Sequence, residues 1–131
     1  MNKDIQNYIM KYTDEIQQLF CELRILIIQS VSCDIEEKLW AKIPSYYDGD
    51  RFIRLIPFKD HINIEAAAII ENKDKLKEFK ITPKGMLQIY CNQTIPERVL
   101  KIIFKDTLSE VPDKLNKEEK RIMEIKNKNS K

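Results

Sequence analysis

The chain has very few of the residues on which common catalytic and phosphate-binding motifs depend. Its 131 residues include two glycines, Gly49 and Gly85, and one histidine, His61. A glycine-rich phosphate loop needs several closely spaced glycines. The sequence also lacks a nucleophile elbow, and its spacing nominates no serine or cysteine partner for His61. We therefore expect a protein that is not an enzyme.

Long apolar runs and cysteine motifs are also missing. The longest run of leucine and isoleucine, residues 25–28, is far shorter than the roughly 20 apolar residues that cross a bilayer. The N-terminus lacks the apolar stretch of a secretory signal, so we expect a cytoplasmic protein with no membrane partner. Cys21, Cys33 and Cys91 have no zinc or disulfide spacing, and unpaired cysteine is usually buried, so three buried thiols are predicted.

The composition, with 43% hydrophobic and 34% charged residues, is typical of one globular domain. The net charge is +2, and residues 113–131 carry seven basic and four acidic residues, a net of +3, which leaves −1 for residues 1–112. We predict a single domain over residues 1–112 and a basic helix or tail over 113–131. The tail has no interleaved aromatic residues, so a nucleic-acid partner is not expected.

Hydrophobic periodicity predicts two helices at the start of the chain. Apolar residues recur at helical spacing from Ile5 to Tyr12 and again from Ile16 to Ile27. Thr13 separates the two stripes and is expected to cap the second helix, which should end near residue 29. The acidic run at 34–37 is interpreted as a solvated loop.

Alternating apolar residues predict strands in the middle of the chain. In the first strand, 39–43, Leu39, Ala41 and Ile43 should share one face, and Pro44 should end it. A turn at Asp48-Gly49 should lead into a strand at 51–58, whose Pro57 favours an edge or a bulge, and a further strand is expected at 61–67. A short helix at 69–79, a turn at 82–85 and a strand at 86–91 should follow. Thr94 and Pro96 should begin the next helix, and a further helix is expected to run to about Lys126.

Strands joined by tight turns pair antiparallel, and their apolar face must be covered. The expected fold class is therefore α+β. We predict a two-layer sandwich in which an antiparallel sheet of four to five strands is backed by the N-terminal and C-terminal helices.

The segment FKDHINIE predicts a specific hairpin register. If Lys59 and Asp60 form a two-residue loop, Phe58 lies opposite His61 and Arg54 lies opposite Glu65. Arg54 and Glu65 should then form a cross-strand ion pair. Three interpretations of His61 stay open: an exposed or ring-stacked hairpin residue, a ligand contact, or a metal ligand.

Three short segments together resemble the YdhG-like family, which is catalogued mostly as a domain of unknown function. The segments are EKLWAKIPSYY at 37–47, RLIPFKDHINIE at 54–65 and TPKGMLQIY at 82–90, followed by a proline-started helix. The resemblance runs from about Ile5 to about Leu108 and implies an antiparallel sheet backed by terminal helices. Some family members are described as frataxin-like iron chaperones, so the resemblance also implies an iron-binding and delivery role.

The family motifs nominate a binding site near the strand ends, where loops on a rigid sheet often carry binding groups. The candidate residues are Lys42, Pro44, Tyr46, Lys59, His61, Lys84 and Gln88. They suggest a small anionic ligand or a protein partner, with no cofactor apart from the iron that the resemblance implies. The alternative is that Pro44 and Gly85 shape the backbone, Trp40 packs and the lysines are solvated.

Overall fold

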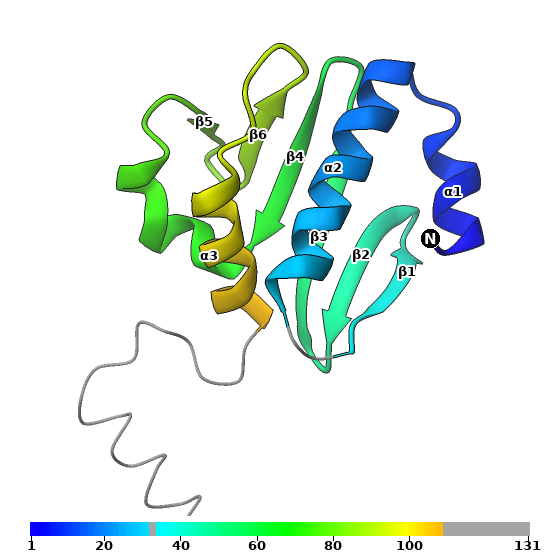
Figure 1. The fold of residues 1–131 in the computed structure, drawn as a ribbon, viewed down its shortest axis with the longest axis horizontal. Helices are drawn as coiled ribbons and strands as arrows, with labels where there is room; N and C mark the ends of the chain where they lie inside the picture. Colours follow the sequence, from blue (N-terminus) through cyan, green and yellow to red (C-terminus); the bar gives the residue numbers. More distant parts are fainter. Residues whose placement is uncertain (32–33, 109–131) are drawn as a thin grey trace, which may run out of the picture.

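The computed structural model describes residues 1–31 and 34–108 and has an α+β architecture (Figure 1). Three α-helices and one 3₁₀ helix accompany a single sheet in this part of the chain. The elements are α1 (Lys3–Ile9), α2 (Asp14–Ser30), β1 (Glu36–Trp40), β2 (Ile43–Asp48), β3 (Arg51–Pro57), β4 (His61–Ala66), the 3₁₀ helix η1 (Ala67–Lys75), β5 (Lys80–Ile81), β6 (Leu87–Tyr90) and α3 (Glu97–Leu108).

Side-chain caps fix the starts of the first two helices. The Thr13 hydroxyl accepts a hydrogen bond from the Ile16 amide at 3.3 Å, as expected for the N-cap of α2. The Asn2 side chain caps α1 in the same way, and its amide oxygen accepts from the amide of Asp4 at 2.9 Å. The first helix ends at Ile9, and Tyr12 packs against the core from the connecting turn.

The sheet has six strands in the order β1-β2-β3-β4-β6-β5, and every neighbouring pair is antiparallel. The antiparallel arrangement was expected, but the strand number is higher than the predicted four to five. The additional strands are β2, most of which lies between the predicted strand at 39–43 and the predicted turn at Asp48-Gly49, and the two-residue β5.

The first hairpin is the largest correction to the predicted fold. Residues 41 and 42 form its turn, with φ angles of 49° for Ala41 and 66° for Lys42, so the predicted strand at 39–43 is wrong. Because the chain reverses there, Ile43 lies opposite Trp40 and shares its face, instead of the face of Leu39. Pro44 does not end a strand but lies inside β2, opposite Leu39.

Smaller differences concern the later elements. The last residue of β3 is Pro57, which pairs with Ile62 of β4. Strand β3 is therefore not an edge strand as predicted, although its pairing with β2 runs only to Arg54 and does not reach Pro57. The short helix begins at residue 67 instead of 69 and is a 3₁₀ helix. The last described helix starts at Glu97, and the Pro96 carbonyl accepts from the Leu100 amide.

One face of the sheet forms the core. The side chains that point to it from the central strands are completely buried, namely Ile53, Leu55, Ile62, Ile64, Leu87 and Ile89. They pack under apolar residues of α2 and α3, and both helices lie across this face in Figure 1. Each such side chain stabilises the fold by about 1.5–3 kcal/mol relative to exposure.

The opposite face, called the open face below, carries Trp40, Arg54 and His61. No helix of the described residues covers it, and Trp40 and Phe58 are 49% and 42% exposed. The open face therefore exposes large side chains, whereas the core face buries them.

Several remaining expectations concern cysteines and the chain end. Cys21 and Cys91 are half-buried, so the prediction of buried thiols is wrong for these two. Cys21 lies at the margin of the buried stripe of α2, and Cys91 follows the last residue of β6. Cys33 and the predicted helix and tail beyond residue 112 lie outside the described residues. None of the described helices is both long and apolar enough to cross a membrane.

Candidate functional site

The β3–β4 hairpin has the register predicted from its sequence. Pairs run from Arg54 with Glu65 to Pro57 with Ile62, and the Phe58 amide donates to the His61 carbonyl at 2.8 Å to close the turn. Lys59 and Asp60 are the two loop residues. The hairpin therefore presents Phe58 and His61 side by side on the open face.

Three aromatic side chains form a row at this end of the open face. The Phe58 and His61 rings stack with centroids 4.7 Å apart and planes inclined by 8°. On the other side of His61 lies the ring of Tyr90, again at 4.7 Å, with planes inclined by 30°. His61 and Tyr90 are register partners on β4 and β6. The spacing of about 4.8 Å between neighbouring strands thus sets the spacing of the rings.

The imidazole of His61 is held in place from three directions. Its two faces are covered by Phe58 and Tyr90, and Nδ1 lies 2.8 Å from a carboxylate oxygen of Asp60. The backbone of Asp60 is itself fixed, because its carbonyl accepts from the Cys91 amide at 3.1 Å. His61 is 15% exposed and is a ring-stacked residue.

A second cluster occupies the middle of the open face around Arg54. The guanidinium lies over the rings of Trp40 and Phe52, at 4.0 and 3.7 Å from their centroids. It also donates to Glu65 at 3.0 Å and to the Tyr47 hydroxyl at 3.3 Å. The predicted cross-strand ion pair is therefore present, and the aromatic contacts around it were not predicted.

The structure divides the seven candidate residues among four places. Lys42 and Lys59 lie in the β1–β2 and β3–β4 turns, at the same end of the sheet as His61. Gln88 is on the open face, where it opposes Asn63.

The other candidates lie away from that end. Pro44 and Tyr46 point to the helix-covered face and are buried. Lys84 belongs to the turn before β6, at the opposite end of the sheet. There it lines a cavity of about 420 Å³ together with Arg51 and Ile70. The seven residues thus do not converge on one point, and Lys42, Lys59 and His61 form the subset that shares an end.

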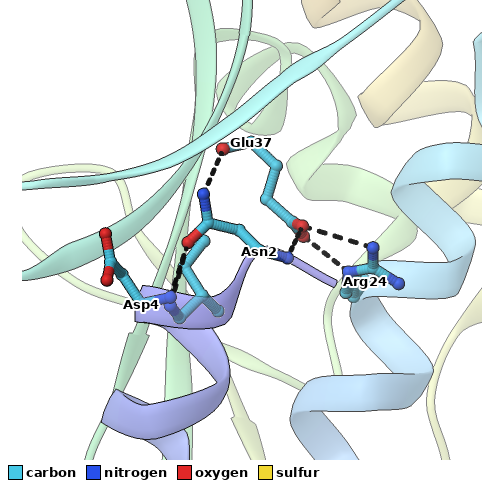
Figure 2. A network of polar contacts seen from close by, with 5 residues as sticks. Asn2, Asp4, Arg24 and Glu37 are labelled. Carbon is cyan, nitrogen blue, oxygen red and sulfur yellow. Dashed lines mark hydrogen bonds and ion pairs between the residues drawn. The ribbon is translucent and has the colours of Figure 1, made fainter.

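The sequence interpretation missed a polar network around Glu37 (Figure 2). This carboxylate accepts two hydrogen bonds from Arg24 of α2, one from Nε at 2.5 Å and one from Nη2 at 3.3 Å. It accepts a third from the Asn2 backbone amide at 2.6 Å, and the Asn2 side chain donates to the Glu37 carbonyl at 3.2 Å. The run at 34–37 is therefore not merely a solvated loop. The sequence did indicate that Glu37 points inward, because residues two apart in a strand share a face and Glu37 precedes the inward-facing Leu39 by two residues.

Burial and the ion pair shift the pKa values of Glu37 and Tyr46 in this network. Burial alone raises the pKa of Glu37, but the hydrogen bonds from Arg24 and from the Asn2 backbone outweigh it and hold that pKa below its ordinary value. Burial and the neighbouring carboxylate raise the pKa of Tyr46. Arg24, Glu37 and Tyr46 line a cavity of about 310 Å³. Tyr46 therefore stays a neutral phenol beside the ion pair.

The thiol of Cys91, which follows the His61 partner Tyr90, is poorly suited to nucleophilic chemistry. Burial and the carboxylates of Glu15 and Asp60 raise the pKa of Cys91. A thiol with a raised pKa holds less of the reactive thiolate at neutral pH. His61 also directs Nδ1 to Asp60.

Within residues 1–31 and 34–108, no group of three or more histidine, cysteine, aspartate or glutamate side chains is placed to hold a metal ion. Iron binding stays a prediction from the family resemblance. Anaerobic calorimetric titration with ferrous ion tests it, and a lack of micromolar binding would remove it.

Comparisons of the chain with protein-family models, with curated proteins and with solved structures give no match.

Proposed function

We propose that the chain is a cytoplasmic, non-catalytic binding domain of the YdhG-like type, whose ligand is a small anion. The ligand is held at the end of the sheet that carries Lys42, Lys59 and His61. The observation that carries this proposal is that two turn lysines lie at the same end of the sheet as the ordered row of rings on the open face, Phe58, His61 and Tyr90. Both lysines are exposed, so their ammonium groups are available to an anion.

The backbone at this end is well suited to holding the two lysines in place. Lys59 belongs to a two-residue loop closed by the Phe58–His61 hydrogen bond. Lys42 belongs to a second two-residue loop, closed by the pair Trp40 and Ile43. Short loops on a paired sheet lose little conformational entropy when a ligand binds, which favours affinity.

The non-catalytic part of the proposal is supported by the state of the nearby reactive groups. His61 is stacked on both faces and engaged by Asp60, and the Cys91 thiol has a raised pKa. A nucleophile with a free general base is the usual requirement for covalent catalysis. The groups at this end are better suited to contact than to proton transfer.

A thermal-shift screen of phosphorylated and carboxylated metabolites, followed by calorimetry, tests the proposal. At least one anion should raise the melting temperature of the wild-type chain, and the double variant Lys42→Ala/Lys59→Ala should bind it at least tenfold more weakly. Losing about 1.4 kcal/mol of charge-assisted contact corresponds to this factor.

The matched control is Lys77→Ala/Lys101→Ala, which removes the same charge from other exposed positions and should leave the affinity within twofold of wild type. The proposal fails if no anion distinguishes the wild type from the Lys42/Lys59 variant. A protein partner on the open face is the alternative that such a result would leave.

A further inference from the structure

We infer that the bound anion carries an aromatic or heteroaromatic ring, which stacks on the outer face of Phe58 as the fourth member of the ring row. This inference rests on the proposed function, because it specifies the ligand class of the same site. Three features of the described residues lead to it: the periodicity of the row, its open end at Phe58, and the lysines beside that end.

The row follows the sheet, with one ring for each strand. The two centroid distances are equal, 4.7 Å, and correspond to the separation of neighbouring strands. His61, in the middle, has a ring against each of its faces. Phe58, at the end, has a ring against one face, and among the described residues no second ring stacks on it.

The row stops at Phe58 because the next strand is too short to continue it. Strand β2 pairs with β3 from Ser45 opposite Arg54, and continuing this register places Ile43, its first residue, level with Ile56. Before Ile43 the chain turns away to β1 through residues 41 and 42. No β2 residue is therefore level with Phe58, which explains why this large apolar side chain is 42% exposed.

A flat ring is the group that this position selects. Aromatic rings prefer offset stacking at centroid distances of about 4.5–7 Å, a range that includes the existing 4.7 Å repeat. The partner ring is already held rigidly, because His61 stacks on its other face. A ligand ring would thus stack on a Phe58 side chain that is already fixed, so binding would not cost conformational entropy of Phe58.

The charges beside Phe58 select a ring that bears an anion. Lys59 follows Phe58 directly, and Lys42 lies in the β1–β2 turn at the same end of the sheet. The acidic neighbour, Asp60, is engaged with His61 at 2.8 Å, on the β4 side of the row and away from β2. A ring on the β2 side therefore has ammonium groups nearby.

Three probes separate the ring from the charge: adenosine 5′-monophosphate, which has both, ribose 5-phosphate, which has only the anion, and adenosine, which has only the ring. Phenyl phosphate and methyl phosphate repeat the comparison with a second ring. Calorimetry on the full chain should give the nucleotide at least tenfold higher affinity than ribose 5-phosphate or adenosine, and phenyl phosphate the same advantage over methyl phosphate.

Two ring variants locate the contact. Phe58→Leu keeps an apolar side chain but removes the ring, and should weaken nucleotide binding at least fivefold while ribose 5-phosphate binding stays within twofold. Trp40→Leu removes the other exposed ring of the open face, whose contact is with Arg54, and should leave both affinities within twofold. Thermal melts of both variants check that they are folded.

The two proposals fail in different ways. If ring-free anions bind as tightly as their ring-bearing counterparts and Phe58→Leu changes nothing, this inference is wrong and the anion site stands. If none of these anions and none of those in the thermal-shift screen binds, both are wrong. Equal losses in Phe58→Leu and Trp40→Leu would also overturn the inference, because they would place the ring elsewhere on the open face.

Discussion

At the scale of single residues, Glu37 connects parts of the fold that are distant in sequence. One carboxylate on the edge strand accepts hydrogen bonds from Arg24 of α2 and from the backbone of Asn2, which precedes α1 (Figure 2). Both side chains of the ion pair are largely buried, with 20% of Arg24 and 15% of Glu37 exposed. A buried charge without its partner is costly, so each member depends on the other.

Glu37→Gln should therefore destabilise the protein by about 2 kcal/mol at neutral pH, since hydrogen bonds to charged groups contribute about 1.5–3 kcal/mol. The pKa of Glu37 is lowered in the folded protein, so its contribution is fully present above the ordinary value of 4.5 and is lost as the pH falls through the folded value. Urea unfolding of wild type and variant should thus give stabilities that differ at pH 7 and converge below pH 4.5.

The neighbouring Glu36 provides the control for this prediction. It pairs with Lys38 at 2.9 Å, but its side chain is 64% exposed. Exposed ion pairs contribute little, so Glu36→Gln should change stability by less than about 0.5 kcal/mol at any pH. A constant gap between wild type and Glu37→Gln down to pH 3 would contradict the assigned role of the carboxylate charge.

At the scale of elements, the two hairpins show what sequence patterns can and cannot predict. The β3–β4 hairpin could be predicted because apolar alternation on both sides of Lys59-Asp60 fixes a single register. The β1–β2 hairpin could not, because its turn residues are Ala41 and Lys42, which rarely adopt positive φ. The turn predicted at Asp48-Gly49 is confirmed, but it joins β3 to β2, a strand that was not predicted.

The candidate site was predictable to a similar extent. The stacking of Phe58 on His61 follows from the register of one hairpin, and so does the pair of Arg54 and Glu65. The third ring, Tyr90, could not be placed from sequence, because β6 lies between β4 and β5 in the sheet although β5 precedes it in the chain. Such a strand order depends on packing over the whole domain and leaves no local pattern.

The Ala41-Lys42 turn also yields a test. Both residues have positive φ, and a two-residue turn of this kind prefers Asn-Gly. The double variant Ala41→Asn/Lys42→Gly should stabilise the protein by about 1 kcal/mol, because each left-handed residue with a Cβ costs about 1–2 kcal/mol. Urea unfolding measures the change, and an unchanged midpoint would show that the turn carries no strain.

Gly49 offers the opposite change in the next hairpin. Its φ is +63°, and a Cβ at this position would meet nothing within 4 Å. Gly49→Ala should therefore lower the free energy of unfolding by about 1 kcal/mol, through backbone strain alone and without a steric clash. Opposite signs in the two turns would identify positive φ as the common cause.

At the scale of the whole molecule, one face of the sheet builds the core and the open face is where we propose that the ligand binds. The core is built from side chains between Ile5 and Leu108, which come from all three α-helices, from the η1 region and from the strands of one face. Residues 1–112 carry a net charge of −1, since the total of +2 includes +3 from residues 113–131. Attraction of an anion to the open face must therefore come from local lysines, and the affinity should fall as salt screens them.

This distribution predicts where the chain can be cut. A chain ending at residue 112 keeps every member of the described core, so it should still unfold cooperatively. Its melting temperature should lie within about 3 °C of that of the full chain, because a stability change of about 1 kcal/mol shifts a domain of this size by a few degrees. A chain ending at residue 101 loses Ile103, Phe104 and Leu108, which are completely buried, and should not unfold cooperatively. Circular dichroism melts compare the three chains. If the cut at 112 lowers the melting temperature by more than about 5 °C, residues 113–131 contribute to the fold and the predicted boundary is wrong, because surface segments that bury no apolar side chains change stability by less than this.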